Sequence, residues 1–218
     1  MGLPYSVARF VLDGLIGAVS GWDVRGRKNV PRAGGVIVAS NHISFFDPPL
    51  IGTAAMRELH YLAKEELFRS PLLGPLIRYF NTIPIRRGMA DLTGLTRAMD
   101  VLKAGNALIV FPEGSRMRDG ELHPGRPGVG MLSVNTDALI VPCFISGSDR
   151  PNQWVPRRGL LRVSFGPART WREMAGAGVD ETPGRALYQA VADGVMRDIA
   201  ALKDDYRQHP RKASRGTA

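Results

Sequence analysis

Short apolar runs, separated by longer stretches with polar positions, recur along the chain. Residues 36–39 (Val-Ile-Val-Ala) follow two glycines and end at Ser40-Asn41, which is the pattern of a buried β-strand. In 82–85, Pro84 also favours an extended chain, because the residue before a proline avoids helical angles. Comparable apolar runs predict further strands at 60–63, 107–111, 139–145 and 160–165.

Between these runs, apolar residues recur at helical spacing. The clearest case covers residues 91–104, where Asp91 can cap the first turn and Gly105 follows as a stop signal. Pro48 and Pro49 favour a helix start, since proline is tolerated in a first turn. The pattern predicts helices over 48–57, from 70 onward, over 91–104 and from 182 onward.

Strands that alternate with helices predict an α/β fold. We expect a mostly parallel central sheet flanked by helices, because parallel strands are joined through helical crossovers. No internal repeat and no shift in composition divides the chain. A single domain is therefore predicted over residues 23–207.

The two ends of the chain are predicted as separate segments outside residues 23–207. Residues 1–22 have the spacing of an amphipathic helix, whose apolar side chains either cover the core or contact a membrane surface. A bilayer span needs about 20 apolar residues, and residues 7–19 fall short of this and include Arg9 and Asp13. Residues 208–218 are basic, lack large apolar side chains and are expected to be disordered.

Charge narrows the set of partners. The chain has 218 residues, and 29 Lys and Arg against 20 Asp and Glu give a formal net charge of +9. Such an excess favours anionic partners, namely nucleic acid, phospholipid headgroups or phosphorylated substrates. The basic residues are spread along the sequence without a nucleic-acid-binding motif, so a nucleic-acid-binding module is the weaker alternative and nucleic acid is not expected as a partner.

The single cysteine limits the chemistry further. It excludes a disulfide within the chain and a Cys-rich metal site. Cys143 lies in the apolar run 139–145, which predicts a buried structural thiol. The histidines other than His42 are scattered without the spacing of metal ligands, so no metal site is expected.

Two polar segments stand at the ends of predicted strands, where ligands gather in sheets of this class. The first is Asn41-His42-x4-Asp47, after strand 36–39. A histidine can take a proton from an alcohol near neutral pH, and a carboxylate can orient its ring and stabilise the imidazolium. In the structural alternative His42 caps a helix and Asp47 is a turn residue. The pair alone does not decide between the two.

The second segment runs from Phe111-Pro112 through Glu113 to Arg116 and follows the strand predicted at 107–111. Gly114 permits a close backbone approach, Ser115 offers a hydroxyl, and Arg116 offers a planar guanidinium suited to phosphate. Arg86-Arg87 follows another extended run. An isolated arginine is more often a solvated surface charge, but two such loops after apolar strands favour a phosphate site.

A nucleophilic serine is the competing chemistry. Ser44 lies near His42 in the sequence, but the chain has no Gly-x-Ser-x-Gly elbow. Direct attack by the hydroxyl of an acceptor, without a covalent enzyme intermediate, therefore fits the sequence better.

Together, the two segments closely resemble the glycerolipid acyltransferase family (PlsC-type), which contains the 1-acylglycerol-3-phosphate acyltransferases. His-x4-Asp alone is a weak signal, but joined to Phe-Pro-Glu-Gly at this distance it is specific. The resemblance covers about residues 25–165, and further blocks similar to those of the family occur in the expected order at 64–68, 83–87 and 140–142.

This resemblance implies transfer of a fatty acyl group from acyl-CoA or acyl carrier protein to the hydroxyl of 1-acylglycerol-3-phosphate, giving phosphatidic acid. It implies His42 as the general base and Asp47 as its catalytic partner. No metal and no cofactor is implied beyond the thioester cosubstrate. The residues implied in substrate binding are Asn41, Arg87, Glu113, Gly114, Ser115 and Arg116, and those implied in the acyl-chain groove are Phe45, Phe46 and Phe80.

The resemblance also implies partners. These are a lysophospholipid, the acyl donor and an anionic membrane surface, to which the protein would attach peripherally at the cytoplasmic face without a transmembrane span. The sequence departs from the family pattern at Asn81 (usually glycine), Arg86 (often acidic), Ser115 (commonly threonine) and Gly125-Arg126 (an aromatic-lysine pair). The alternative is therefore an acyltransferase of the same family that acts on another lysolipid or a glycolipid.

Overall fold

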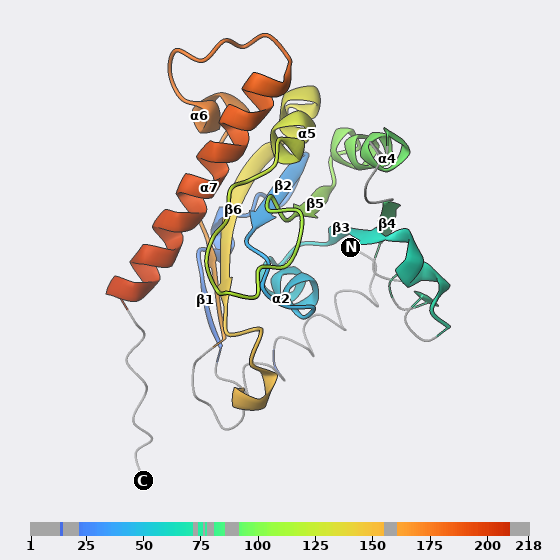
Figure 1. The fold of residues 1–218 in the computed structure, drawn as a ribbon, viewed down its shortest axis with the longest axis vertical. Helices are drawn as coiled ribbons and strands as arrows, with labels where there is room; N and C mark the ends of the chain where they lie inside the picture. The colour runs from blue at the N-terminus through green and yellow to red at the C-terminus, as the bar shows by residue number, and fades with distance from the viewer. Residues whose placement is uncertain are drawn as a thin grey trace.

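The computed structural model describes residue 14 and residues 22–71, 74–75, 77, 81–85, 92–154 and 161–209. Almost all of the predicted N-terminal helix and basic tail lie outside these residues. Arg87 and Phe80 lie outside them as well. In the described part, the chain forms a single α/β domain around one seven-stranded sheet (Figure 1).

The sheet is mostly parallel, as predicted. Its strands lie in the order β1-β7-β6-β2-β5-β3-β4. Neighbouring strands from β6 to β4 run parallel, whereas β7 pairs antiparallel with β6, and β1 pairs parallel with β7. The strand bounds are β1 Asp23–Arg25, β2 Val36–Ser40, β3 Leu59–Lys64, β4 Thr82–Ile85, β5 Ala107–Val110, β6 Leu139–Ser146 and β7 Arg162–Phe165.

Helices cover both faces of the sheet. One face packs on α2, and the other packs on α4, α5, α6 and α7. In Figure 1 the long helix α7 runs beside β6, with α5 and α6 near its upper end. The bounds are α2 Asp47–Ala54, α4 Leu92–Lys103, α5 Gly128–Thr136, α6 Trp171–Ala175 and α7 Arg185–Gln208, with 3-10 turns η1 Arg27–Asn29, η2 Glu65–Arg69 and η3 Pro151–Gln153.

The predicted helices over 48–57, over 91–104 and from 182 onward correspond to α2, α4 and α7. The first is shorter than predicted, because Met56 has a positive φ of 53° and the chain leaves the helix there. Of the helix predicted from residue 70, residues 74, 75 and 77 are described and helical. Helix α5 was not predicted. Its Gly130 lies so close to Tyr188 of α7 that a Cβ would overlap the Tyr188 backbone.

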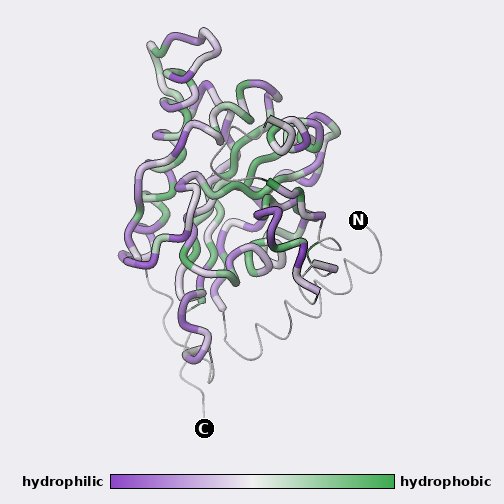
Figure 2. The backbone as a smooth tube through the Cα atoms, turned by 45° about the vertical axis from the view of Figure 1, so that its right-hand side comes forward, coloured by the Kyte–Doolittle hydropathy of each residue, from purple (hydrophilic) through white to green (hydrophobic). Residues whose placement is uncertain are grey.

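The strands at the centre carry the core. All five residues of β2 are buried, with Val36 and Val38 on the α2 face and Ile37 and Ala39 on the opposite face. The sequence of a strand buried on both faces is a continuous run of apolar residues, without the alternation of apolar and polar residues seen in half-buried strands. In Figure 2 the hydrophobic residues, drawn in green, gather in the centre of the molecule.

Strands β6, β2 and β5 are adjacent and parallel, so their carboxyl ends meet at one edge of the sheet. The segments that follow them are 147–148, 41–47 and 111–116. The topology therefore brings the two polar segments singled out in the sequence together, and it adds a third segment beside them.

The cysteine lies inside β6, opposite Ser40 of β2. Cys143 is fully buried, as predicted, and burial raises the pKa of its thiol well above the ordinary value. A raised pKa leaves less of the reactive thiolate at any given pH. We therefore expect negligible reaction with a thiol reagent such as DTNB at pH 8 in the folded protein, and one thiol per chain after unfolding in urea. Rapid stoichiometric labelling of the folded protein would contradict this.

Candidate active site

Asp47 is the most heavily bonded carboxylate at this edge. It begins α2 and is fully buried. Its Oδ2 accepts hydrogen bonds from His42 Nδ1 at 2.7 Å and from the backbone N–H groups of Ile43 at 2.7 Å and Ser44 at 2.8 Å. A carboxylate at the first turn of a helix is also favoured by the helix dipole. The five-residue spacing works because the chain turns between residues 42 and 47.

His42 is held on its ring and on its backbone. Because a carboxylate only accepts, the contact with Asp47 assigns the proton to Nδ1 and leaves Nε2 with its lone pair. The ring stacks on Phe111, with centroids 3.9 Å apart and planes at 19°. The His42 N–H donates to Glu113 Oε2, and its carbonyl accepts from Met117 N–H at 2.8 Å. The side chain is 13% exposed, which leaves an opening for a substrate.

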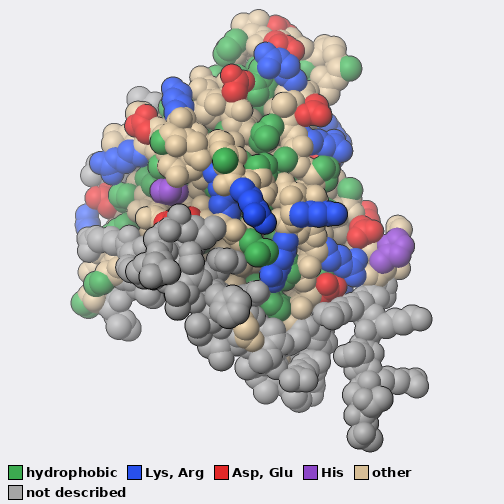
Figure 3. All heavy atoms as spheres, turned by 180° about the vertical axis from the view of Figure 1, so that it is seen from behind, with side chains coloured by type: hydrophobic (Ala, Val, Ile, Leu, Met, Phe, Trp, Pro, Cys, Tyr) green, Lys and Arg blue, Asp and Glu red, His purple; other side chains and the backbone are tan. Residues whose placement is uncertain are grey.

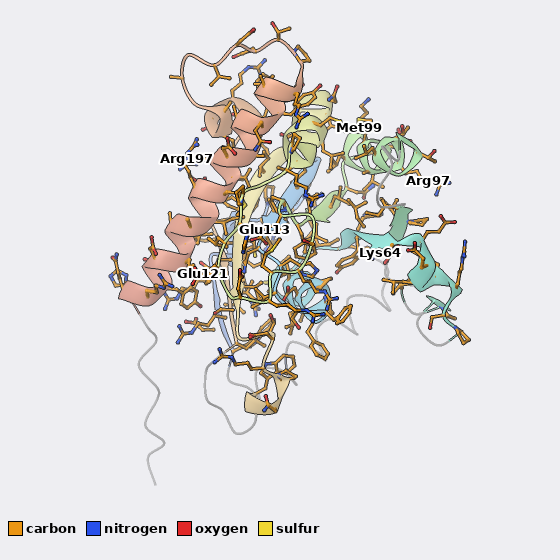
Figure 4. The ribbon with its side chains drawn as sticks, in the orientation of Figure 1. Lys64, Arg97, Met99, Glu113, Glu121 and Arg197 are labelled. Carbon is orange, nitrogen blue, oxygen red and sulfur yellow. The ribbon has the colours of Figure 1, made fainter. Side chains whose placement is uncertain are left out.

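Glu113 ties the two sequence segments together. Its Oε2 accepts from His42 N–H and its Oε1 from His123 N–H, each at 3.0 Å. The residue is almost fully buried, and Figure 4 shows it near the middle of the molecule. Burial raises the pKa of this carboxyl, and the two N–H donors oppose that rise. Both carboxylate oxygens of Glu113 thus accept hydrogen bonds from backbone N–H groups.

Asn41 continues the β2–β6 pairing with its side chain. Its Nδ2 donates to the carbonyl of Ile145 at 3.0 Å, and its Oδ1 accepts from Ile145 N–H at 2.8 Å. The residue is buried. These two bonds fix the segment that carries His42 to the end of β6, and they use both ends of the carboxamide.

The loop after Glu113 brings an arginine beside an aromatic ring. Gly114 has a φ of 76°, and a Cβ there would meet Arg126 Cδ and Nε at 2.9 Å. Ser115 and Arg116 are half-buried. The Arg116 guanidinium lies 3.4 Å from the centroid of the Phe45 ring. Arginine stacks on aromatic faces through its planar, delocalised charge.

Phe45 and Phe46 lie on the surface beside His42. They are 69% and 45% exposed, and Met56 is the third exposed large hydrophobic residue among those described. Phe46 also packs edge-on against Trp154, with centroids 5.4 Å apart. The role of Phe45 and Phe46 in an acyl-chain groove stays a prediction.

Ser148 is the site residue that the sequence did not reveal. It follows β6, is fully buried, and its Oγ donates to Asp47 Oδ1 at 2.5 Å. Every oxygen of Asp47 therefore has a partner. The only available signal was the small, polar stretch after 139–145, which is typical of many turns. The position of the hydroxyl depends on β6 lying next to β2.

Two departures from the family pattern have local explanations. Asn81 has a φ of 52°, a left-handed conformation that glycine adopts freely and asparagine tolerates, and its Nδ2 donates to Glu58 Oε1. Gly125 is buried against α7, where a Cβ would lie 2.9 Å from Met196 Cγ. Neither residue contacts the His42–Asp47 pair, so both changes leave that pair intact.

Among the described residues, no group of three or more His, Cys, Asp and Glu side chains is placed to hold a metal ion. No helix in the described part is both long and apolar enough to cross a membrane.

Comparisons with known proteins identify the family of this chain. A profile of the family described as Acyltransferase matches residues 21–146, and the chain belongs to that family. The 1-acyl-sn-glycerol-3-phosphate acyltransferase of Bacillus subtilis is 24% identical over 205 residues, which cover 94% of this chain and 99% of that protein. The chloroplastic 1-acyl-sn-glycerol-3-phosphate acyltransferase BAT2 of Brassica napus is 28% identical over 131 residues, 59% of this chain and 38% of that protein. The match thus spans less than half the length of this plant relative.

A solved structure of another acyltransferase is similar to this chain in fold and sequence. The crystal structure of the 1-acyl-sn-glycerophosphate (LPA) acyltransferase PlsC from Thermotoga maritima has a TM-score of 0.61 and 29% sequence identity. The similarity covers 84% of this chain and 73% of that one. The expected PlsC-type family and its mostly parallel α/β fold are confirmed.

Proposed function

We propose that this protein transfers a fatty acyl group from a thioester donor, acyl-CoA or acyl-ACP, to the hydroxyl of 1-acylglycerol-3-phosphate, giving phosphatidic acid. The observation that carries the proposal is the 2.7 Å contact between His42 Nδ1 and Asp47 Oδ2, which leaves Nε2 as a base. The names of the relatives support the acceptor.

The reaction follows from this arrangement. His42 Nε2 takes the proton of the acceptor hydroxyl as its oxygen attacks the thioester carbonyl. Asp47, which accepts from Nδ1–H, stabilises the imidazolium that forms. When the tetrahedral intermediate collapses, the carbon–sulfur bond breaks and the leaving thiolate receives the proton from Nε2. The products are an ester and a free thiol, and no metal or redox cofactor is needed.

The other predicted residues take supporting roles in this proposal. Ser115, Arg116 and Arg87 bind the phosphate of the acceptor, with Gly114 allowing close approach of the backbone. Phe45, Phe46 and Phe80 contact the acyl chain. Asn41 and Glu113 were predicted to bind substrate, but their polar atoms are taken up by backbone groups, so we propose that they position His42.

The protein is proposed to act while attached peripherally to the cytoplasmic face of a membrane, because its lipid substrate and product reside in a bilayer. The net charge of +9 supports attraction to anionic lipid. Figure 3 shows several Lys and Arg side chains near the middle of the described part of one face, with Asp and Glu side chains around them.

The test is a substrate panel. Purified protein would be incubated with lysophosphatidate, uncharged lysolipids and a glycolipid acceptor, each with acyl-CoA and with acyl-ACP, and the products identified by mass spectrometry. We expect phosphatidic acid as the main product. Acylation of another acceptor at a higher kcat/KM would contradict the proposed acceptor, and no acyl transfer with any pair would contradict the proposed reaction.

Ser148 gives a prediction of its own. Replacing it with alanine removes the donor to Asp47 Oδ1 and leaves that oxygen buried without a partner, so we expect kcat to fall about tenfold. KM should change little, because Ser148 acts through Asp47. Threonine at this position keeps the hydroxyl and should restore most of kcat. If Ser148→Ala lowers the melting temperature and leaves kcat unchanged, the residue stabilises the fold only.

A further inference from the structure

The loop 117–123 begins and ends at the candidate active site. At its start, the Met117 N–H donates to the carbonyl of His42 at 2.8 Å. At its end, the His123 N–H donates to Glu113 Oε1 at 3.0 Å, and the other oxygen of this carboxylate accepts from His42 N–H. Both ends of the loop are thus bonded to His42 or to the carboxylate that holds its backbone.

The middle of the loop is exposed and is stabilised by one of its own side chains. Residues 118–121 lie on the surface. Asp119 Oδ1 accepts from the Glu121 N–H at 3.1 Å, and its Oδ2 lies 2.6 Å from His123 Nε2. Such local hydrogen bonds from an aspartate stabilise a turn. They join one part of the loop to another, but they do not join the loop to the rest of the domain.

Lys203 joins this exposed stretch to helix α7. Its Nζ donates to Glu121 Oε2 at 2.8 Å and to the carbonyl of Gly120 at 3.4 Å. Figure 4 shows Glu121 beside α7. The Lys203 side chain is 13% exposed, although lysine side chains are mostly exposed in folded proteins. The hydrogen bond and the positive charge of Lys203 lower the pKa of the Glu121 carboxyl, so this residue is ionised at neutral pH.

Arg116 directly precedes this loop, so its position depends on the conformation of the loop. Its guanidinium lies 3.4 Å from the centroid of the Phe45 ring, which is itself largely exposed. The backbone after Arg116 is fixed by the hydrogen bond from Met117 N–H to His42. Ordering a side chain or a loop when a ligand binds costs binding free energy. A loop that is already held therefore presents Arg116 to a phosphate at a lower cost.

We propose that Lys203 is a positioning residue, which holds the loop 117–123 against α7 and so keeps Arg116 in place for the phosphate of the acceptor. It acts through the loop and does not touch the reacting atoms. The hydrogen bond between His42 and Asp47 does not involve the loop, so the effect falls on acceptor binding rather than on proton transfer. The inference rests on the proposed function, because it concerns the acceptor of that reaction.

The first test measures the loop directly and does not depend on turnover. Lys203→Met removes the charge and the donor but keeps most of the apolar side chain. Hydrogen–deuterium exchange, read by mass spectrometry on peptides that cover 117–123, would follow the N–H groups of Met117 and His123. We expect these amides to exchange about fivefold faster in Lys203→Met than in the wild type, because the loop opens more easily. Lys203→Arg can still pair with Glu121 and should restore the wild-type rate.

The matched control is Lys103→Met. Lys103 is an exposed lysine at the end of α4, and the same change there should leave both the exchange of 117–123 and the kinetic constants at wild-type values. Equal exchange of this loop in Lys203→Met and in the wild type would overturn the inference. Equally fast exchange in Lys103→Met would overturn it too, because the effect would then not be specific to Lys203.

Kinetics test whether the loop positions the acceptor. In Lys203→Met we expect KM for lysophosphatidate to rise about fivefold, with KM for the acyl donor unchanged and kcat within about twofold of the wild type. Glu121→Gln should raise the same KM, and the double variant should not exceed Lys203→Met, since the two residues act as a pair. Lys203→Arg should restore KM.

A purely structural role of Lys203 gives a different result. The melting temperature of Lys203→Met would then fall while KM for lysophosphatidate stayed unchanged, and this outcome would overturn the inference. If the wild type acylates no lysolipid, the proposed function fails, and the exchange experiment still decides whether Lys203 holds the loop.

Discussion

Replacing His42 with alanine is expected to lower kcat for acyl transfer by about 10³-fold. The imidazole supplies the Nε2 that takes the proton of the acceptor hydroxyl, and no other described base replaces it, since Asp47 is fully buried behind it. KM should change much less, because the ring acts on the reacting atoms rather than on the phosphate. Initial rates with acyl-CoA and lysophosphatidate would measure both constants.

The control for this variant is another histidine. His60 lies in β3, where its Nδ1 lies 3.3 Å from the carbonyl of Ala107, and it has no contact with the site. His60→Ala should keep kcat within about twofold of the wild type, as expected for a change remote from the chemistry. Circular dichroism would confirm that both variants fold. A folded His42→Ala protein with at least half of the wild-type kcat would remove His42 from the mechanism.

The central strands were predictable because they are buried on both faces. The runs at 36–39, 107–111 and 139–145 became β2, β5 and β6, which differ from the predicted bounds by a single residue. Strand β1 was not predicted, because its Asp23-Val24-Arg25 sequence has no apolar run and its strand form depends on pairing with β7. Helix α5 was missed since Gly130 serves close packing on α7 rather than local helix propensity.

The geometry of the candidate site was less predictable from the sequence than the central strands were. Sequence spacing allowed a contact between His42 and Asp47 but left it undecided, because the turn between them depends on N–H groups that converge on one carboxylate oxygen. The stacking of His42 on Phe111 and the hydrogen bond from Ser148 arise only when β6, β2 and β5 lie side by side. Contacts across adjacent strands leave no signal in the spacing of a single segment.

The second large effect is expected for Asp47→Asn, which changes charge with little change of shape. The amide oxygen can still accept from Ile43 and Ser44 N–H, and Ser148 Oγ can turn to accept from the new NH₂ group. The fold should therefore be retained. With the negative charge removed, the imidazolium formed during proton transfer loses its stabilising partner, and we expect kcat to fall by about 10²-fold to 10³-fold.

The double variant His42→Ala/Asp47→Asn shows whether Asp47 acts through His42 or contributes to catalysis independently of it. If Asp47 acts only through His42, then His42→Ala/Asp47→Asn should be no slower than His42→Ala alone, since groups that act as a unit are not additive. Asp100→Asn, an exposed carboxylate on α4, is the control for the loss of one negative charge and should leave kcat unchanged. A further fall in the double variant, with melting temperatures equal to those of the single variants, would mean that Asp47 acts on the substrate directly and that the base-and-partner assignment of this pair is wrong.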